Sequence, residues 1–426
     1  MSGSPTGTMI RKRLLVIYST HQALHWFSVG VLAPILALVQ LAKGLDLFQI
    51  GLNVALYSGS VVILELPTGG LADAIGRKRV YLYSLLAKFV SIGVLLFAGS
   101  APTFMAGFVG LGISRALSSG SMDAWFVDEY NRVGSDGNLQ RALAVVGIYI
   151  PLSLGLGSAV GGLLPDTLGI AVSSVNSFDI YSSNLLIILL FVVIQFLFTA
   201  IVVKEHRVRR ERYGPAMLYK QLPNILSTSI RYGLKNKVVL MLLIPTAGIG
   251  VALAGLENFW QPRVRELVGP SSKTWIFGVL SAAYFLSASV GSVFITPICR
   301  VFRNNYAVIL FATKVAMGFI WLLVASQSSI AGFSVFYVAL FLFNGFSNSP
   351  HAAILNAQIP ESKRSTLLSF ESLVLQIGVI VGSLVLGYIS KVISIPAAWR
   401  IGAVILIATS VSYLFINKSE YTTGES

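Results

Sequence analysis

Twelve long apolar runs constrain this chain more than any other feature of its sequence. Each is close to or longer than the roughly 20 mostly apolar residues that a helix needs to cross the hydrocarbon core of a bilayer. The runs lack the strict alternation of apolar and polar residues found in membrane β-strands, so they predict helices. They lie at 14–42, 48–72, 80–99, 102–127, 143–164, 184–203, 238–260, 274–297, 304–326, 329–350, 366–389 and 396–416.

The composition excludes a soluble globular protein. Of the 426 residues, 55% are hydrophobic and 11% are charged, whereas soluble domains carry about 25% charged residues. The first run is too long for the core of a signal peptide and shows no cleavage site, so we interpret it as a retained span. The single cysteine, Cys299, cannot form an internal disulfide. The sequence therefore predicts an all-α integral membrane protein with twelve transmembrane helices.

The positive charges indicate the orientation of these helices. Most of the 31 lysine and arginine residues fall in the N-terminus and in the even-numbered connectors. Because positive residues stay on the cytoplasmic side, both termini are expected there. The net charge of +14 is then a topology signal rather than a nucleic-acid surface. The odd-numbered connectors hold only Lys43, Arg263, Arg265, Lys273, Lys391 and Arg400.

The longest connector, 204–237, divides the spans into two sets of six. It either attracts anionic lipid headgroups or is a solvated basic linker. Arg141 stands as far before Gly155 as Arg364 stands before Gly378, which hints at a 6+6 pseudo-repeat of the kind some transporters use. The expected organisation is a cytoplasmic N-terminus (1–13), an N-terminal six-helix half (14–203), a basic cytoplasmic linker (204–237), a C-terminal six-helix half (238–416) and a cytoplasmic tail (417–426).

A charged, glycine-containing stretch, GGLADAIGRKRVY (69–81), lies between the second and third spans. Gly69 and Gly76 permit a close backbone approach and a tight turn. Asp73 is suited to accept hydrogen bonds from the N-terminus of a neighbouring helix, and Arg77 is suited to a bidentate pair with a carboxylate. A simple basic turn is the alternative. It explains the three bases but not the aspartate.

The stretch 69–81 resembles the hallmark cytoplasmic loop of the major facilitator superfamily, and the span number, linker and orientation are similar too. The family often has a base where this chain has Ala74. The resemblance implies two halves that rock around a central site. It also implies an inner latch, in which the aspartate of the loop faces the start of span eleven. Arg77 would pair with an acid near the end of span four, where Asp128 and Glu129 stand.

Three charged residues within the spans are candidates for a proton or charge relay. Arg115 lies inside span four, where a charge costs at least about 2.5 kcal/mol. Its place resembles the family's span-four arginine motif, linked to proton coupling, although Ser119 replaces the usual glycine; a structural arginine paired with a buried acid is the alternative. Asp123 follows about two helical turns later, on nearly the same face. Glu65, in span two, is either a proton carrier or a structural cap.

Spans one and seven supply the candidates for a substrate cavity. His21 and His25 are spaced i, i+4 beside Trp26, which suits a proton relay or a substrate contact. No acid or cysteine cluster accompanies them, so no metal site is expected. Glu257 and Asn258 lie near the outer end of span seven. An acid there suits a cationic aromatic substrate or an outer gate equally.

Span five carries a run of glycines, Gly155, Gly157, Gly161 and Gly162. Such spacings allow close helix packing in membranes. The run also resembles a glycine-rich motif of the family's exporters, in which proline replaces Ser158.

The sequence is thus similar to bacterial drug/proton antiporters of the superfamily, and we expect proton-coupled export of a small organic or amphipathic compound. Uptake or uniport of a metabolite and a non-transporting membrane sensor are the alternatives. Motifs of ATPases and metalloproteases are absent, so no enzymatic activity is expected. We expect no cofactor, a proton gradient as the driving force, and a monomer in the cell (plasma or inner) membrane. The expected partners are a small-molecule substrate, protons and the lipid bilayer, without nucleic acid.

Overall fold

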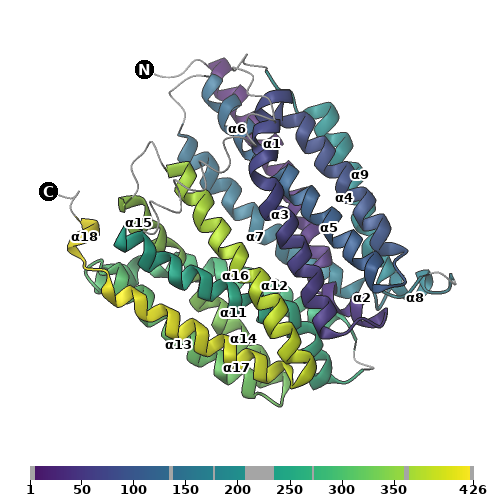
Figure 1. Cartoon of the computed structure of the whole chain (residues 1–426). Coiled ribbons are helices and arrows are strands. Elements are labelled where there is room, and N and C mark those ends of the chain that lie inside the picture. Colours follow the sequence, from purple (N-terminus) through teal and green to yellow (C-terminus); the bar gives the residue numbers. More distant parts are fainter. Residues whose placement is uncertain are drawn as a thin grey trace. The chain divides into compact units, whose positions relative to one another are not determined.

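The computed structural model describes residues 5–133, 138–175, 178–206, 235–270, 273–358 and 364–422. Throughout these residues the regular secondary structure is helical (Figure 1), as predicted. Within these described ranges, eleven helical segments are long and apolar enough to cross a membrane. The class predicted from the apolar runs, an all-helical membrane protein, is therefore confirmed.

The chain forms two compact units, and the first contains the described residues within 1–39, 60–220 and 273–282. The second half of α3 (Leu47–Ile75) and the start of α12 (Trp275–Val301) belong to it. Its other main helices are α1 (Pro5–Leu32), α4 (Arg77–Leu96), α5 (Ala101–Ser118), α6 (Ser121–Arg132), α7 (Leu139–Leu163), α8 (Leu168–Val172) and α9 (Ser182–Val202).

The second unit contains the described residues within 40–59, 221–272 and 283–426. A division of the chain at the linker would place segment 40–59 in the first unit and segment 273–282 in the second. The structure places each of them in the other unit. The short α2 (Leu36–Ala42) spans the boundary between the units. The main helices of the second unit are α11 (Lys237–Val268), α13 (Tyr306–Ser326), α14 (Ile330–Phe346), α15 (Asn348–Gln358), α16 (Arg364–Val392), α17 (Ile395–Ser410), the 3₁₀ helix η2 (Val411–Phe415) and α18 (Ser419–Thr422).

Glycines let α1 and α7 pack backbone against backbone in the first unit. A Cβ atom added to Gly157 would lie 2.3 Å from the carbonyl oxygen of Phe27, and one added to Gly161 would lie 2.4 Å from that of Val31. Asn184 of α9 donates hydrogen bonds to the carbonyl oxygens of Val31 (3.1 Å) and Gly161 (2.7 Å). These contacts fix three helices to one another without any charged group.

The next glycine, Gly162, faces the first turn of α12, also in the first unit. A Cβ atom at Gly162 would lie 2.5 Å from the Cα of Gly278. The Thr274 hydroxyl donates to the carbonyl of Gly162 (2.7 Å). Asp166 accepts the backbone N–H groups of Thr274 and Trp275, at 2.7 and 3.2 Å, and so caps the start of α12.

In the second unit, the first half of α3 packs against α16. A Cβ atom at Gly51 would lie 2.1 Å from the carbonyl oxygen of Ser383. Lys391, near the end of α16, forms an ion pair with Asp46, just before α3 (2.8 Å). Burial raises the pKa of the Asp46 carboxyl, but the bonds from Lys391 and from the Gln49 backbone hold that pKa below its ordinary value overall.

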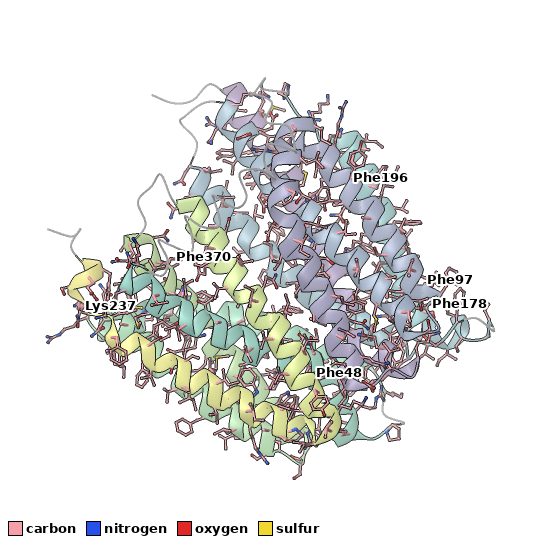
Figure 2. The ribbon with its side chains drawn as sticks, in the orientation of Figure 1. Phe48, Phe97, Phe178, Phe196, Lys237 and Phe370 are labelled. Atoms are coloured by element: carbon pink, nitrogen blue, oxygen red, sulfur yellow. The ribbon has the colours of Figure 1, made fainter. Side chains whose placement is uncertain are left out.

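Large apolar side chains cover much of the outer surface of both units. Val301, Ile201 and Val293 are 80%, 73% and 72% exposed. Figure 2 shows Phe97 and Phe178 beside one another, with ring centroids 5.8 Å apart. Extensive exposed apolar surface is unfavourable in water, so these side chains are suited to contact with lipid.

The fourth apolar run is not the single helix that the sequence predicted over 102–127. Helix α5 ends at Ser118, and Gly120 adopts a left-handed conformation (φ 66°) before α6 begins at Ser121. Glycine adopts this conformation without steric cost, so it ends the first helix and redirects the chain. The prediction that Arg115 and Asp123 share a face of one helix is therefore wrong.

The start of α4 is held by a carboxylate that sequence reasoning missed. Glu205, just after α9, accepts the backbone N–H groups of Arg77 (2.8 Å) and Lys78 (3.3 Å). Gly76 has φ 105°, and a Cβ atom there would lie 2.9 Å from the Glu205 carboxylate. A negative group at a helix N-terminus satisfies unpaired N–H groups and the helix dipole. Gly76 is thus required both by its backbone angle and by the space that Glu205 fills.

Gly161→Ala should destabilise the protein, because the added methyl group meets the backbone of α1, which cannot move aside like a flexible side chain. We expect a loss of about 1–3 kcal/mol, typical of overpacking, measured as a lower midpoint of thermal unfolding in detergent. Gly93→Ala on α4 is the matched control, because nothing lies within 4 Å of its added Cβ. It should be neutral or stabilising by up to about 1 kcal/mol, from helix propensity. Equal effects of the two variants would contradict the close packing.

Glu205→Ala should lower stability by about 1 kcal/mol, the usual cost of losing a helix cap. The control is Glu266→Ala, which removes an exposed carboxylate paired with Arg263 on the same helix. Such surface pairs contribute about 0.5 kcal/mol or less. The same thermal unfolding measurement compares the two. A smaller loss for Glu205→Ala than for the control would argue against the cap.

Candidate functional site

A cavity of about 350 Å³ lies within the first unit, lined by residues of α1, α4, α5, α6 and α7 and of the turn between α5 and α6. Five of the residues predicted as relay or cavity candidates line it. They are His21, His25, Trp26, Arg115 and Asp123. The structure thus brings together candidates from two expected spans that the sequence could only consider separately.

Asp123, in the first turn of α6, is hydrogen-bonded to α1. Its Oδ1 accepts the Tyr18 hydroxyl and the Gln22 amide, the latter at 2.8 Å. The Gln22 Nε2 also lies 2.8 Å from the Tyr18 hydroxyl, and the Trp26 indole donates to Gln22 Oε1 at 3.2 Å. Tyr18, Gln22 and Trp26 are spaced i, i+4, so one face of α1 carries all the partners in this network except Asp123. That spacing was the available signal for Tyr18, which the sequence interpretation missed.

A second polar group surrounds Tyr81 of α4, which was also missed. Its hydroxyl lies 3.3 Å from His25 Nδ1 and accepts a hydrogen bond from Gln195 Nε2 at 2.8 Å. The ring of His21 packs against that of Tyr81, with centroids 4.6 Å apart. His21 is 2% exposed, and neither ring nitrogen has a hydrogen-bond partner among the described residues.

Arg115, in the last turn of α5, faces the cavity as an exposed side chain. Its guanidinium forms no ion pair or hydrogen bond with any residue that the structure describes. The structure therefore does not provide the buried acid required by the structural alternative. The negative end of the α5 dipole offsets part of the charge.

A further cation lies next to the cavity wall. The Lys88 ammonium donates to the Ser28 hydroxyl at 2.7 Å, and that hydroxyl donates to the carbonyl oxygen of His25 at 2.8 Å. Lys88 therefore contacts the helix that carries the cavity histidines.

Glu65 does not line this cavity. It accepts a hydrogen bond from the hydroxyl of Ser119, the residue that follows α5, at 2.8 Å. On the next turn of α3, Thr68 donates to the carbonyl oxygen of Ala116 at 2.8 Å. This geometry fits the structural reading of Glu65 better than a role as a proton carrier.

The predicted pair between Arg77 and an acid near the end of the fourth apolar run is present. Arg77 Nη1 lies 2.8 Å from Asp128 Oδ2, which links α4 to α6. Gly69 and Asp73 lie within helix α3. The side chain of Asp73 is outside the described part of the structure, so the contact predicted for it stays a prediction.

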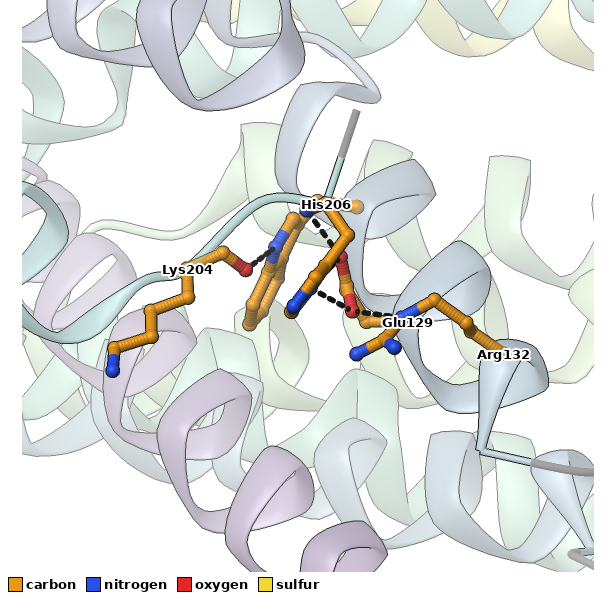
Figure 3. Close-up of polar contacts among 5 residues, drawn as sticks. Glu129, Arg132, Lys204 and His206 are labelled. Atoms are coloured by element: carbon orange, nitrogen blue, oxygen red, sulfur yellow. Dashed lines mark hydrogen bonds and ion pairs between the residues drawn. The ribbon is translucent and has the colours of Figure 1, made fainter. Parts of the chain in front are cut away.

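Glu129, the neighbouring acid, has a different set of partners (Figure 3). It is buried and accepts Arg132 Nε at 2.9 Å and the backbone N–H of His206 at 2.8 Å. Close by, the Trp125 indole donates to the carbonyl oxygen of Lys204 at 3.0 Å. Glu129 thus fastens the segment after α9 onto α6, and Asp128 is the acid that pairs with Arg77.

The candidates from span seven belong to the second unit. Glu257 accepts the Tyr284 hydroxyl at 2.8 Å, and Asn258 is buried and donates to the Ser383 hydroxyl at 3.0 Å. Glu371 is hydrogen-bonded to His351 in the same unit. Among the described residues, no group of three or more His, Cys, Asp or Glu side chains is placed to hold a metal ion.

Comparison with known proteins agrees with this architecture. The family model of the Major Facilitator Superfamily matches residues 20–350. The MFS-type transporter YxaM of Bacillus subtilis is 23% identical over 407 residues, which is 94% of this chain and 96% of that protein.

Solved structures share the fold at low sequence identity. The nucleoside transporter NupG has a TM-score of 0.74 at 14% identity, and the alignment covers 95% of this chain and 100% of that one. An occupied, inward-facing bacterial homologue of the human lysosomal transporter Spinster has a TM-score of 0.71 at 13% identity, with 97% and 96% covered.

The family model extends over more than half of the chain and includes the 69–81 stretch on which the resemblance was based. The chain belongs to the major facilitator superfamily and is a membrane transporter, not an enzyme.

Proposed function

We propose that the chain is a secondary active transporter that exports a small organic or amphipathic compound across the cell membrane in exchange for protons. In this proposal, twelve helices cross the membrane, with both termini cytoplasmic and with the halves 14–203 and 238–416 joined by the linker 204–237. The halves alternate access around a central site. The protein acts as a monomer, without a cofactor, and is driven by the proton gradient.

The observation that carries the proposal is the environment of Asp123. This carboxylate lines the cavity, and its Oδ1 accepts hydrogen bonds from two side chains of α1, Tyr18 and Gln22. Hydrogen bonds to an ionised carboxylate are stronger than those to a neutral group. Protonation of Asp123 removes that advantage and turns one oxygen into a donor. Proton binding in the cavity therefore weakens the contact between α1 and α6.

The short helix α6 connects this event to the inner latch. Asp123 lies in its first turn, and Asp128 of the same helix pairs with Arg77 of α4. The break at Gly120 separates α6 from α5, so α6 is not constrained as part of a longer helix. A shift of α6 on protonation would act on the ion pair at its other end.

The direction of transport rests on a different feature. The glycines of α7 resemble the exporters' motif, and Gly157 and Gly161 place α7 directly against the cavity helix α1. This favours export over the alternatives of uptake or uniport.

Asp123→Asn should uncouple transport from protons, because asparagine keeps the hydrogen-bonding shape but does not titrate. We expect proton movement on substrate addition to fall to the level of empty proteoliposomes, measured with an enclosed pH-sensitive dye. Substrate exchange without a gradient should continue. Glu266→Gln, which removes an exposed carboxylate on α11, is the control and should keep wild-type coupling. Unchanged coupling in Asp123→Asn would assign the proton to another group.

Everted membrane vesicles test the direction. They are energised to an acidic interior and given aromatic compounds that carry permanent negative, neutral or permanent positive groups. Export predicts that a transported compound enters these vesicles against its gradient and dissipates the proton gradient. Accumulation in right-side-out vesicles driven by an inward proton gradient would instead establish uptake.

A further inference from the structure

We propose that the cavity of the first unit binds a small organic anion with a flat ring, and that Arg115 receives its anionic group. The inference rests on the proposed function, since it names the substrate class of the same cavity. Three independent features carry it: the balance of charge, an unpartnered histidine, and the aromatic walls.

Positively charged side chains at or beside the cavity outnumber the negatively charged ones. Arg115 faces the cavity with no protein partner among the described residues, and Lys88 is joined to the wall through Ser28. Asp123 is the acid among the residues that line the cavity, and its Oδ1 already accepts two hydrogen bonds from α1. Within the part of the chain that the structure describes, no ion pair or hydrogen bond joins Asp123 to Arg115. Because this guanidinium faces the cavity without a protein partner among the described residues, it is available to pair with a bound anion.

His21 points to a second ligand contact. Its side chain is 2% exposed and lines the cavity, yet both ring nitrogens lack partners in the described part of the chain. Buried polar groups are usually hydrogen-bonded, so an exception needs a reason. A neutral imidazole offers one donor and one acceptor. A polar substituent on the bound anion satisfies it.

The remaining walls favour a flat ring. The polar atoms of Tyr81 and Trp26 are already hydrogen-bonded, to Gln195 and Gln22, so these residues offer the ligand their ring faces and edges. The rings of His25 and Trp26 meet edge to face, 5.2 Å between centroids. Aromatic ligands stack on such surfaces. A cavity of about 350 Å³ is near the lower end of ligand pockets and suits one or two fused rings.

A cation is the less favourable occupant. Glu257, the acid that the sequence suggested for a cationic substrate, belongs to the second unit and is bound to Tyr284. In the first unit a cation would meet the positive field of Arg115 and would compete with Tyr18 and Gln22 for Asp123.

The test uses purified full-length protein and a matched probe set: benzenesulfonate, naphthalene-1-sulfonate, neutral benzenesulfonamide and benzyltrimethylammonium. A ligand that binds the folded protein raises its unfolding midpoint in a saturable way. We expect saturable stabilisation by at least one sulfonate and none by the amide or the ammonium compound at equal concentration.

Variants then locate the anion. Arg115→Gln should weaken sulfonate binding about tenfold to a hundredfold, the usual effect of losing a hydrogen bond to a charged group. Arg115→Lys should recover part of the affinity, because it keeps the charge but loses the guanidinium fork. Arg141→Gln removes an exposed charge at the start of α7, outside the cavity lining, and should bind as wild type. If Arg115→Gln does not fold, the affinity of the lysine variant tests the role of Arg115, and the wild-type probe series tests the preference for an anion.

Three results would overturn the proposal: binding of the neutral or cationic probe as tight as that of the sulfonates, unchanged sulfonate affinity in Arg115→Gln, or no sulfonate binding at all. Other results distinguish a failure of the anion site from a failure of the proposed function. Proton-coupled transport of a neutral or cationic compound would retain the antiporter and reject the anion site. Sulfonate binding that depends on Arg115, without coupled proton movement, would do the reverse.

Discussion

The close approach of α1 and α7 is the contact on which the described site depends. Side chains are too bulky for this approach, so glycine at 157 and 161 lets the two backbones meet, and Asn184 holds them by hydrogen bonds to both. Helix α1 carries half of the polar side chains that line the cavity, on one face. Its position, fixed by van der Waals contact rather than by charge, determines where those groups point. Helix α1 therefore carries both the close contact with α7, at Phe27 and Val31, and a row of polar side chains that line the cavity.

The acids near the end of the fourth expected span contact different parts of the first unit. Asp123 is bonded to α1 and faces the cavity, Asp128 pairs with Arg77, and Glu129 binds the chain that follows α9. All three lie on the short α6, which begins only after the left-handed Gly120. One small helix thus contacts α1, the start of α4 and the segment that follows α9.

Much of the architecture follows from the sequence, because long apolar runs in a bilayer can only be helices. The Arg77–Asp128 pair was also foreseeable, from the chemistry of guanidinium and carboxylate and from the family resemblance, although Glu129 was an equal candidate. The break at Gly120 was not foreseen, since the apolar run continues through it and only the backbone angle reveals the turn. Tyr81 and Glu205 were missed for another reason: their partners lie on helices distant in the sequence. No local pattern encodes which residue of α4 meets α1, or which acid reaches the first turn of α4.

The cap that Glu205 places on α4 has a practical consequence for dissecting the protein. A transporter with two six-helix halves can be expressed as two separate polypeptides that are combined in one membrane. Composition alone would place the cut directly after the last apolar residue of α9. Such a cut would remove the acceptor for the first N–H groups of α4, and with it the backbone N–H of His206 that binds Glu129. A fragment that keeps both contacts must extend through residue 206.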